Sequence, residues 1–162
     1  MLATKTNELT FRTMQTQADA DAFRTLNEEW IVRLFRLEEK DRTTLGDPWG
    51  EIVATGGQVY LASSADATVG CAALVRLEQG VFELSKMAVA PEARGQGVGR
   101  KLLTYVLQQG RELGAHTVVL GSSTQLENAV HLYESLGFRH VAEADLPIRY
   151  ERASVWMKLD LR

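Results

Sequence analysis

The sequence predicts a mixed α/β protein in which strands and amphipathic helices share one hydrophobic core. Residues 81–103 have the pattern of an apolar strand, a glycine-rich turn and a helix. Residues 58–77 hold two β-prone runs around the short connection Ala65-Asp66, which indicates a hairpin. Residues 117–121 form a short, continuously apolar run, which is typical of a strand covered on both faces.

The length of 162 residues favours a single domain spanning residues 1–162. A chain of this size buries roughly two thirds of the surface that it exposes when unfolded. Its 45% hydrophobic and 24% charged residues are ordinary for a soluble globular protein. The sequence contains neither a repeat nor a low-complexity linker that would mark a domain boundary.

Composition also limits the classes of function. A net charge of -3 and the absence of a Lys/Arg run argue against a nucleic-acid partner. No apolar stretch approaches the roughly 20 residues of a membrane span, and the N-terminus lacks a signal peptide's apolar core, so we expect a cytoplasmic protein without a membrane partner. The three histidines lack metal-ligand spacing, so no metal is expected. The single cysteine, Cys71, is expected to be a small buried residue.

The remaining elements follow from periodicity and breakers. Phe23, Leu26, Trp30 and Ile31 recur at helical spacing, and Ala129, Leu132, Tyr133 and Leu136 share one helix face. In chain order we expect a strand at 11–17, a helix from about 20 to 37, a short helix at 49–54, strands at 58–63, 68–77 and 81–89, a helix ending near 113 with Gly114 as its cap, a strand at 117–121, a helix at 127–136, and strands at 138–142 and 154–159.

The turn Arg94-Gly-Gln-Gly-Val-Gly-Arg100 is built to hold phosphate. Three glycines at alternate positions permit backbone angles that a side chain would disfavour. Backbone N–H groups of such a turn converge at a helix start, where the helix dipole and two arginines add positive potential. An ordinary tight strand-to-helix turn is the alternative.

Two common phosphate motifs do not fit this turn. The Walker pattern needs Gly-Lys-Ser/Thr, and the dinucleotide fingerprint needs a glycine at position 100 or 102, which hold Arg100 and Leu102. The turn instead resembles the acetyl-CoA signature of the GNAT superfamily of acyl-CoA N-acyltransferases, Arg/Gln-x-x-Gly-x-Gly/Ala, through Arg94, Gly97 and Gly99.

A second segment supports this resemblance. Residues 128–138 are similar to the family signature Asn-x-x-x-x-Tyr-x-x-x-Gly-Phe, about 30 residues after the first. The resemblance covers residues 68–142 well and the first 50 residues loosely. It implies a mixed, mostly antiparallel sheet that is splayed between its fourth and fifth strands and flanked by helices. It also implies acetyl-CoA as cosubstrate and, from family habit alone, a homodimer.

The resemblance implies where coenzyme A (CoA) binds. Backbone groups of the fourth strand pair with the pantetheine arm, and the glycine turn holds the pyrophosphate. The cofactor-binding residues implied in this sequence are Met87, Ala88, Val89, Arg94, Gly95, Gln96, Gly97, Val98, Gly99, Arg100 and Asn128.

Two residues are candidates for catalysis. Tyr133 matches the tyrosine that often protonates the leaving sulfur in this family, and a core aromatic is the alternative. Glu83 interrupts an apolar strand and is a candidate base for the amine. Period-two alternation puts it on the face of Ser85, Met87 and Val89, unless a β-bulge changes the parity. A surface or salt-bridged carboxylate, paired with Lys86 or Arg76, is the alternative.

The resemblance implies that the loop 145–153 helps cover the acceptor site, where Arg149, Tyr150, Glu151 and Arg152 either bind a carboxylate or pair among themselves. The sequence as a whole indicates an N-acetyltransferase that transfers acetyl to a primary amine of a small molecule or peptide by direct attack in a ternary complex. A non-catalytic acyl-CoA-binding module and an enzyme for longer acyl groups are the alternatives.

Overall fold

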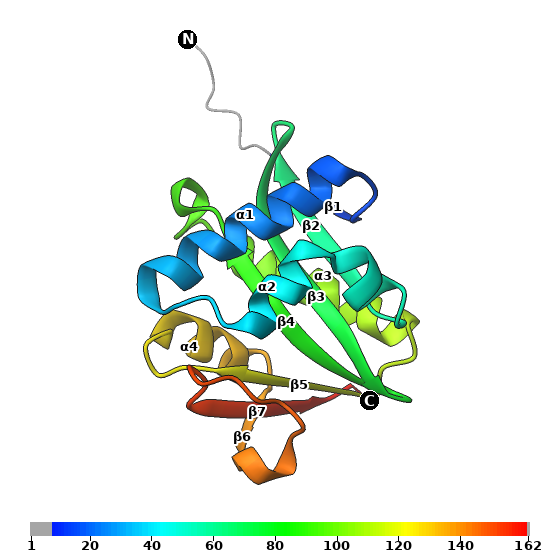
Figure 1. The fold of residues 1–162 in the computed structure, drawn as a ribbon, viewed down its shortest axis with the longest axis vertical. Coiled ribbons are helices and arrows are strands. Elements are labelled where there is room, and N and C mark those ends of the chain that lie inside the picture. Colours follow the sequence, from blue (N-terminus) through cyan, green and yellow to red (C-terminus); the bar gives the residue numbers. More distant parts are fainter. Residues whose placement is uncertain (1–7, 162) are drawn as a thin grey trace.

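A computed structural model describes residues 8–161 of the chain. Its sheet has seven strands in the order β1-β2-β3-β4-β5-β7-β6. Only β4 and β5 pair in parallel, and all other neighbours are antiparallel (Figure 1). The strands are β1 (Thr10–Thr13), β2 (Gln58–Ser64), β3 (Ala67–Glu78), β4 (Val81–Val89), β5 (Thr117–Ser122), β6 (Arg139–Val141) and β7 (Val155–Asp160).

Helices cover both faces of this sheet. α1 and α2 lie in front of the strands in Figure 1, and α3 lies behind them. The helical elements are α1 (Gln17–Leu34), α2 (Glu39–Gly46), the π-helix η1 (Trp49–Val53), the 3-10 turn η2 (Pro91–Ala93), α3 (Val98–Glu112), α4 (Glu127–Ser135) and the 3-10 turn η3 (Glu143–Asp145). Among the residues described, no helix is long and apolar enough to cross a membrane.

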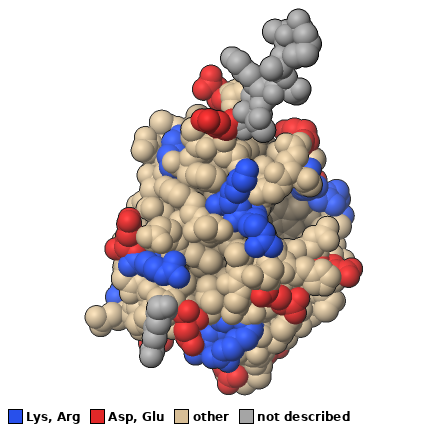
Figure 2. All heavy atoms as spheres, turned by 180° about the vertical axis from the view of Figure 1, so that it is seen from behind, with Lys and Arg blue, Asp and Glu red and all other residues tan. Residues whose placement is uncertain are grey.

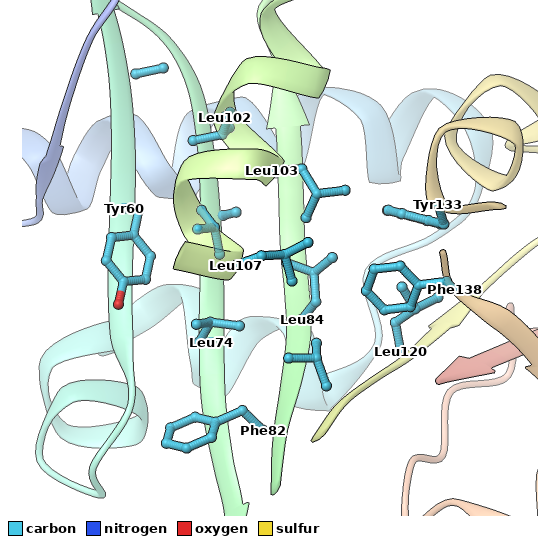
Figure 3. Close-up of a cluster of buried hydrophobic side chains, with 14 of the residues drawn as sticks. Tyr60, Leu74, Phe82, Leu84, Leu102, Leu103, Leu107, Leu120, Tyr133 and Phe138 are labelled. Atoms are coloured by element: carbon cyan, nitrogen blue, oxygen red, sulfur yellow. The ribbon is translucent and has the colours of Figure 1, made fainter. Parts of the chain in front are cut away.

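The hydrophobic core is divided by the sheet. One cluster joins β3, β4 and β5 to α3 and α4 through side chains such as Leu74, Leu84, Leu103 and Phe138 (Figure 3). A second cluster lies between the sheet and α1, with Phe23 at its centre. Burying a side chain of this size contributes about 1.5–3 kcal/mol, so these clusters hold the layers together. On the outer surface behind, basic and acidic side chains form small groups of both signs (Figure 2).

The sheet opens between β4 and β5. These strands pair only at Val81–Thr117, Phe82–Val118 and Glu83–Val119. Beyond Glu83, no described strand pairs with this edge of β4. The splay between the fourth and fifth strands, and the mixed α/β fold class, are therefore confirmed.

The predicted elements recur with shifted ends, and one α-helix, α2, and the two short 3-10 turns η2 and η3 were not predicted. α1 begins at Gln17 because the Thr16 hydroxyl accepts a bond from the Asp19 N–H at 3.1 Å. α2 has the sequence EKDRTTLG, which lacks an apolar period. Its first turn is held by Asp41, whose carboxylate accepts a bond from the Glu38 N–H at 2.9 Å. Such a helix depends on distant partners, which periodicity cannot reveal.

Candidate functional site

A cleft of about 650 Å³ opens where β4 and β5 part. Its wall combines five elements that are distant in the sequence. They are residues 83–89 of β4, residues 93–95 and 97–99 around the glycine turn, residues 120–122 of β5, residues 125–129, 132 and 133 in and before α4, and Tyr150, Arg152 and Ala153 of the loop before β7, with Trp30, Arg33 and Leu34 of α1 alongside. The splay of the sheet therefore creates the cavity at the segment that the sequence marks.

A β-bulge at Lys86 controls which side chains of β4 face which way. At this point β4 has one more residue than β3 opposite, and Lys86 has a φ of 54°. Met87 and Val89 consequently face α3, while Glu83 faces the side of α1 and α2. The period-two prediction that put Glu83 on the face of Met87 and Val89 is wrong, because the bulge reverses the alternation.

The glycine turn has the backbone geometry that an anion site needs. Gly95 and Gly97 have φ values of 78° and 80°, in the left-handed region, and α3 begins at Val98 directly after them. A Cβ at Gly97 would meet no atom within 4 Å, so the turn is open on that side. Gly99 has a different role, because a Cβ there would come within 3.5 Å of Leu132 on α4.

Side chains of the turn are engaged elsewhere. Arg94 donates to Glu29 on α1 at 2.7 Å and to the Val89 carbonyl at 3.2 Å. With Arg33 as the larger contributor, Arg94 lowers the pKa of Glu29. Gln96 donates to the Glu92 carbonyl, and Arg100 to Ser135. Arg94 remains on the cleft wall, whereas Gln96 and Arg100 do not line it.

The other predicted cofactor residues all reach the cleft. Those that line it are Met87, Ala88, Val89, Arg94, Gly95, Gly97, Val98, Gly99 and Asn128. They present the free edge of β4, the glycine turn and the first turn of α4 along one continuous wall. This arrangement offers backbone donors and acceptors more than it offers side-chain charge.

Glu83 lies at the last paired position before the strands separate, and it is only 6% exposed. Burial raises the pKa of its carboxyl group, and the positive charges of Lys40 and Lys86 oppose that shift more weakly. Lys86, one of the two expected pairing partners, instead forms an ion pair with Asp41 at 2.9 Å. Glu83 thus lines the cleft as a buried carboxyl whose pKa is raised above the ordinary value.

Tyr133 lines the same cleft from α4. Its ring packs 5.7 Å from the ring of Phe138, and the residue is 9% exposed (Figure 3). Burial raises the pKa of its phenol to about 12, so the hydroxyl stays protonated at neutral pH. The packing of the ring fits the core aromatic weighed from the sequence, and the residue also lines the cleft, so its role as a proton donor stays a prediction.

Cys71 is fully buried and lies outside the cleft wall. Its sulfur accepts a bond from the Asn27 side-chain amide at 3.4 Å. Burial raises the pKa of the thiol to about 12, so the thiolate is scarce at neutral pH. The prediction of a small buried residue is confirmed.

An ionic cluster closes one end of the cleft, and the sequence did not indicate it. Both oxygens of the fully buried Asp41 carboxylate accept bonds from the Arg152 guanidinium, each at 2.7 Å. Lys86 and the Glu38 N–H, each at 2.9 Å, complete four bonds to this carboxylate. Burial raises the pKa of Asp41, but Arg152 and Lys86 outweigh that effect, so the pKa is lowered well below its usual value.

The loop 145–153 pairs with other elements. Arg152 binds Asp41 and also Glu38 at 3.1 Å, and Glu151 pairs with Arg36. Arg149 donates to the Leu146 and Ile148 carbonyls. The alternative that these loop charges pair among themselves is therefore wrong. Tyr150 and Arg152 line the cleft, and the other loop charges do not.

A family model for the acetyltransferase (GNAT) domain matches residues 55–140, slightly more than half of the chain. The uncharacterized N-acetyltransferase YjgM of Escherichia coli is 39% identical over 92 residues, which cover 57% of this chain and 47% of that protein. The L-amino acid N-acyltransferase MnaT of the same organism is 37% identical over 71 residues, covering 44% of this chain and 40% of that protein. The chain thus spans about half the length of these relatives.

Solved structures agree in fold over nearly the whole chain. A GNAT-family acetyltransferase from Staphylococcus aureus superposes with a TM-score of 0.87 at 21% identity, covering 96% of this chain and all of that one. The acetyltransferase yncA from Salmonella typhimurium, solved with its cofactor acetyl-CoA, has a TM-score of 0.76 at 23% identity and covers 96% and 95% of the two chains. At this level of identity, the likeness concerns the fold.

Proposed function

The chain belongs to the GNAT acetyltransferase family, and from that premise we propose that it transfers an acetyl group from acetyl-CoA to a primary amine. The observation that carries this proposal is the cleft between β4 and β5, whose wall includes a glycine turn, Glu83 of β4 and Tyr133 of α4. Acetyl-CoA supplies an activated thioester.

The features of the cleft fit acetyl-CoA. The edge of β4 beyond Glu83 has no strand partner within residues 8–161, so its backbone groups are available to the amides of a pantetheine arm. The left-handed Gly95 and Gly97 and the start of α3 form a nest for pyrophosphate. The solved Salmonella typhimurium neighbour that binds acetyl-CoA gives independent support.

Three groups of the cleft take part in the transfer: a base, a backbone segment that stabilises negative charge, and an acid. Glu83 removes a proton from the acceptor ammonium, because its raised pKa suits a base working near neutral pH. The neutral amine attacks the thioester carbonyl, and the β4 backbone near Met87 stabilises the negative charge that collects on its oxygen. Tyr133 gives its phenol proton to the departing sulfur, because at a pKa of about 12 it is still a donor, and the proton that the attacking nitrogen sheds on becoming an amide restores the phenol.

Thermal unfolding with acetyl-CoA, free CoA and NAD tests the binding step. A ligand at 100 times its dissociation constant adds about 2.7 kcal/mol to the free energy of unfolding, so acetyl-CoA and CoA should raise the melting temperature and NAD should not. Release of free thiol in the presence of amines then tests transfer. Binding without thiol release from any amine would indicate an acyl-CoA-binding module, and no shift with either CoA species would overturn the site.

A further inference from the structure

The end of the cleft beside Glu83 is surrounded by an unusual number of cations. The ring centroid of Tyr150 lies 4.6 Å from the Lys40 Nζ, 4.6 Å from the Lys86 Nζ and 4.7 Å from the guanidinium carbon of Arg152. The Lys86 Nζ also donates to the Tyr150 hydroxyl at 3.0 Å. Arg152 lies 5.6 Å from the Trp30 ring, so two aromatic side chains frame its guanidinium.

The charges at this end of the cleft suit a molecule that carries both a positive and a negative group. Three cations, Lys40, Lys86 and Arg152, meet only two structural carboxylates, Asp41 and Glu38, which lie outside the cleft wall. Glu83, the remaining carboxyl in this group, faces the cleft as the proposed base. Lys86 and Arg152 are the two cations that line the cleft, and once Glu83 has taken the amine's proton its charge no longer offsets theirs.

Donors are also free to bind an anion. Lys86 has three N–H groups, of which two bind Asp41 and Tyr150. Arg152 uses both N–H groups of Nη1 and one of Nη2 for Asp41 and Glu38. Its Nε and second Nη2 N–H groups, which form one parallel edge, have no acceptor among residues 8–161. Such an edge fits a carboxylate with two bonds, and Asp41 fixes its orientation from behind.

We propose that the acceptor is a free amino acid whose carboxylate binds Arg152 and Lys86 while its amine meets Glu83. Glu83, Lys86 and Arg152 all line this end of the cleft, and Asp41 holds Lys86 and Arg152 side by side, so one small molecule can reach both the base and the cations. A peptide amine lacks this neighbouring carboxylate and is disfavoured. The proposal rests on the proposed acetyltransferase function and narrows its acceptor.

The test compares each of the common L-amino acids with its carboxamide as acceptor, by thiol release from acetyl-CoA. For the best acids, kcat/KM should exceed that of the matched amide roughly 100-fold, because the amide leaves the buried cations without their partner. Equal rates for acid and amide, or turnover only of amines without a carboxylate, would overturn the proposal. The proposal would also be overturned if none of the amino acids were acetylated. In that case, a rise in melting temperature with acetyl-CoA would still support the proposed function.

Two variants test whether Arg152 is the group that binds the carboxylate of the acceptor. Arg152→Lys keeps the charge but loses the fork, so the KM for acids should rise more than kcat falls, and the acid-to-amide ratio should fall below about 10. Arg36→Gln is the matched control, because Arg36 pairs with Glu151 beside Arg152 but lies outside the cleft. It should keep the wild-type ratio. An unchanged ratio in Arg152→Lys would show that the carboxylate binds elsewhere.

Discussion

The two ends of the cleft are built in opposite ways. The glycine turn, residues 94–100, is contiguous in sequence, mostly exposed, and offers backbone groups. The proposed acceptor end brings together Glu38, Asp41, Lys86 and Arg152, whose charged side chains are at most 16% exposed. Local backbone conformation forms the first end, whereas long-range ion pairs that also hold the fold form the second. Substitutions in the turn should therefore lower the affinity for acetyl-CoA with little effect on the free energy of unfolding. Substitutions at the acceptor end should lower both the activity and the free energy of unfolding.

Asp41→Asn should have the largest effect on stability. Removing the shared carboxylate leaves Lys86 and Arg152 buried without compensation, which costs about 3–5 kcal/mol of unfolding free energy in urea denaturation. Because the folded pKa of Asp41 is lowered, its contribution is present above about pH 4 and is lost as pH falls toward the folded pKa. The surviving folded protein should also prefer acids over amides less.

Glu151→Gln is the control for Asp41. Glu151 belongs to the same loop and pairs with Arg36, but that pair is 70–75% exposed and should contribute less than about 1 kcal/mol. A loss below 1 kcal/mol in Asp41→Asn as well would contradict the view that the acceptor end holds the fold.

Glu83→Gln should reduce kcat/KM by about 10²–10⁴, because the amide cannot accept the amine's proton. The wild-type rate should rise with pH through the raised pKa of Glu83, and the variant should lose that dependence. The free energy of unfolding of the wild-type protein should instead fall as the pH rises. A raised folded pKa means that the cost of ionising Glu83 grows as pH rises above about 4.3, so at pH 8 the variant should be at least as stable.

The exposed Glu78 at the end of β3 gives a matched control, and Glu78→Gln should keep both the rate and its pH profile. If the Glu83→Gln enzyme kept the wild-type pH profile, the base would be water or another group, and not Glu83.

Gly97→Leu should weaken acetyl-CoA binding at least about 10-fold while costing only about 1–2 kcal/mol of stability. The stability cost comes from the left-handed φ of 80°, since a Cβ there meets no neighbour, and the affinity loss comes from filling the anion nest. Gly114→Leu has the same backbone penalty, at φ 91° and with open space, but lies past α3 away from the cleft. Calorimetric titration of both variants with acetyl-CoA should therefore separate them. Equal affinities would mean that the turn does not bind the pyrophosphate.

Sequence patterns predict what is local in this molecule. Helix and strand periods, the hairpin at Ala65 and Asp66 with φ of 49° and 66°, and the glycine turn all depend on neighbouring residues. The bulge at Lys86 was only an open alternative, because its left-handed φ depends on tertiary contacts. Asp41 and Arg152 are 111 positions apart, and no period or motif connects them. Most of the fold was thus predictable, and so was a cleft lined by the glycine turn, whereas the ionic cluster around Asp41 was not.

Cys71→Ala should have the smallest effect and tests direct transfer. The thiol is buried with a pKa of about 12, so it cannot serve as a nucleophile without the backbone opening. The variant should keep kcat and KM and lose about 1 kcal/mol of stability from a small cavity. Mass spectrometry of the wild-type protein after incubation with acetyl-CoA should find no acetyl group on Cys71. An acetylated Cys71, together with loss of turnover in the variant, would replace attack by the amine with a covalent acetyl-enzyme and would require the core around Asn27 to open during each cycle.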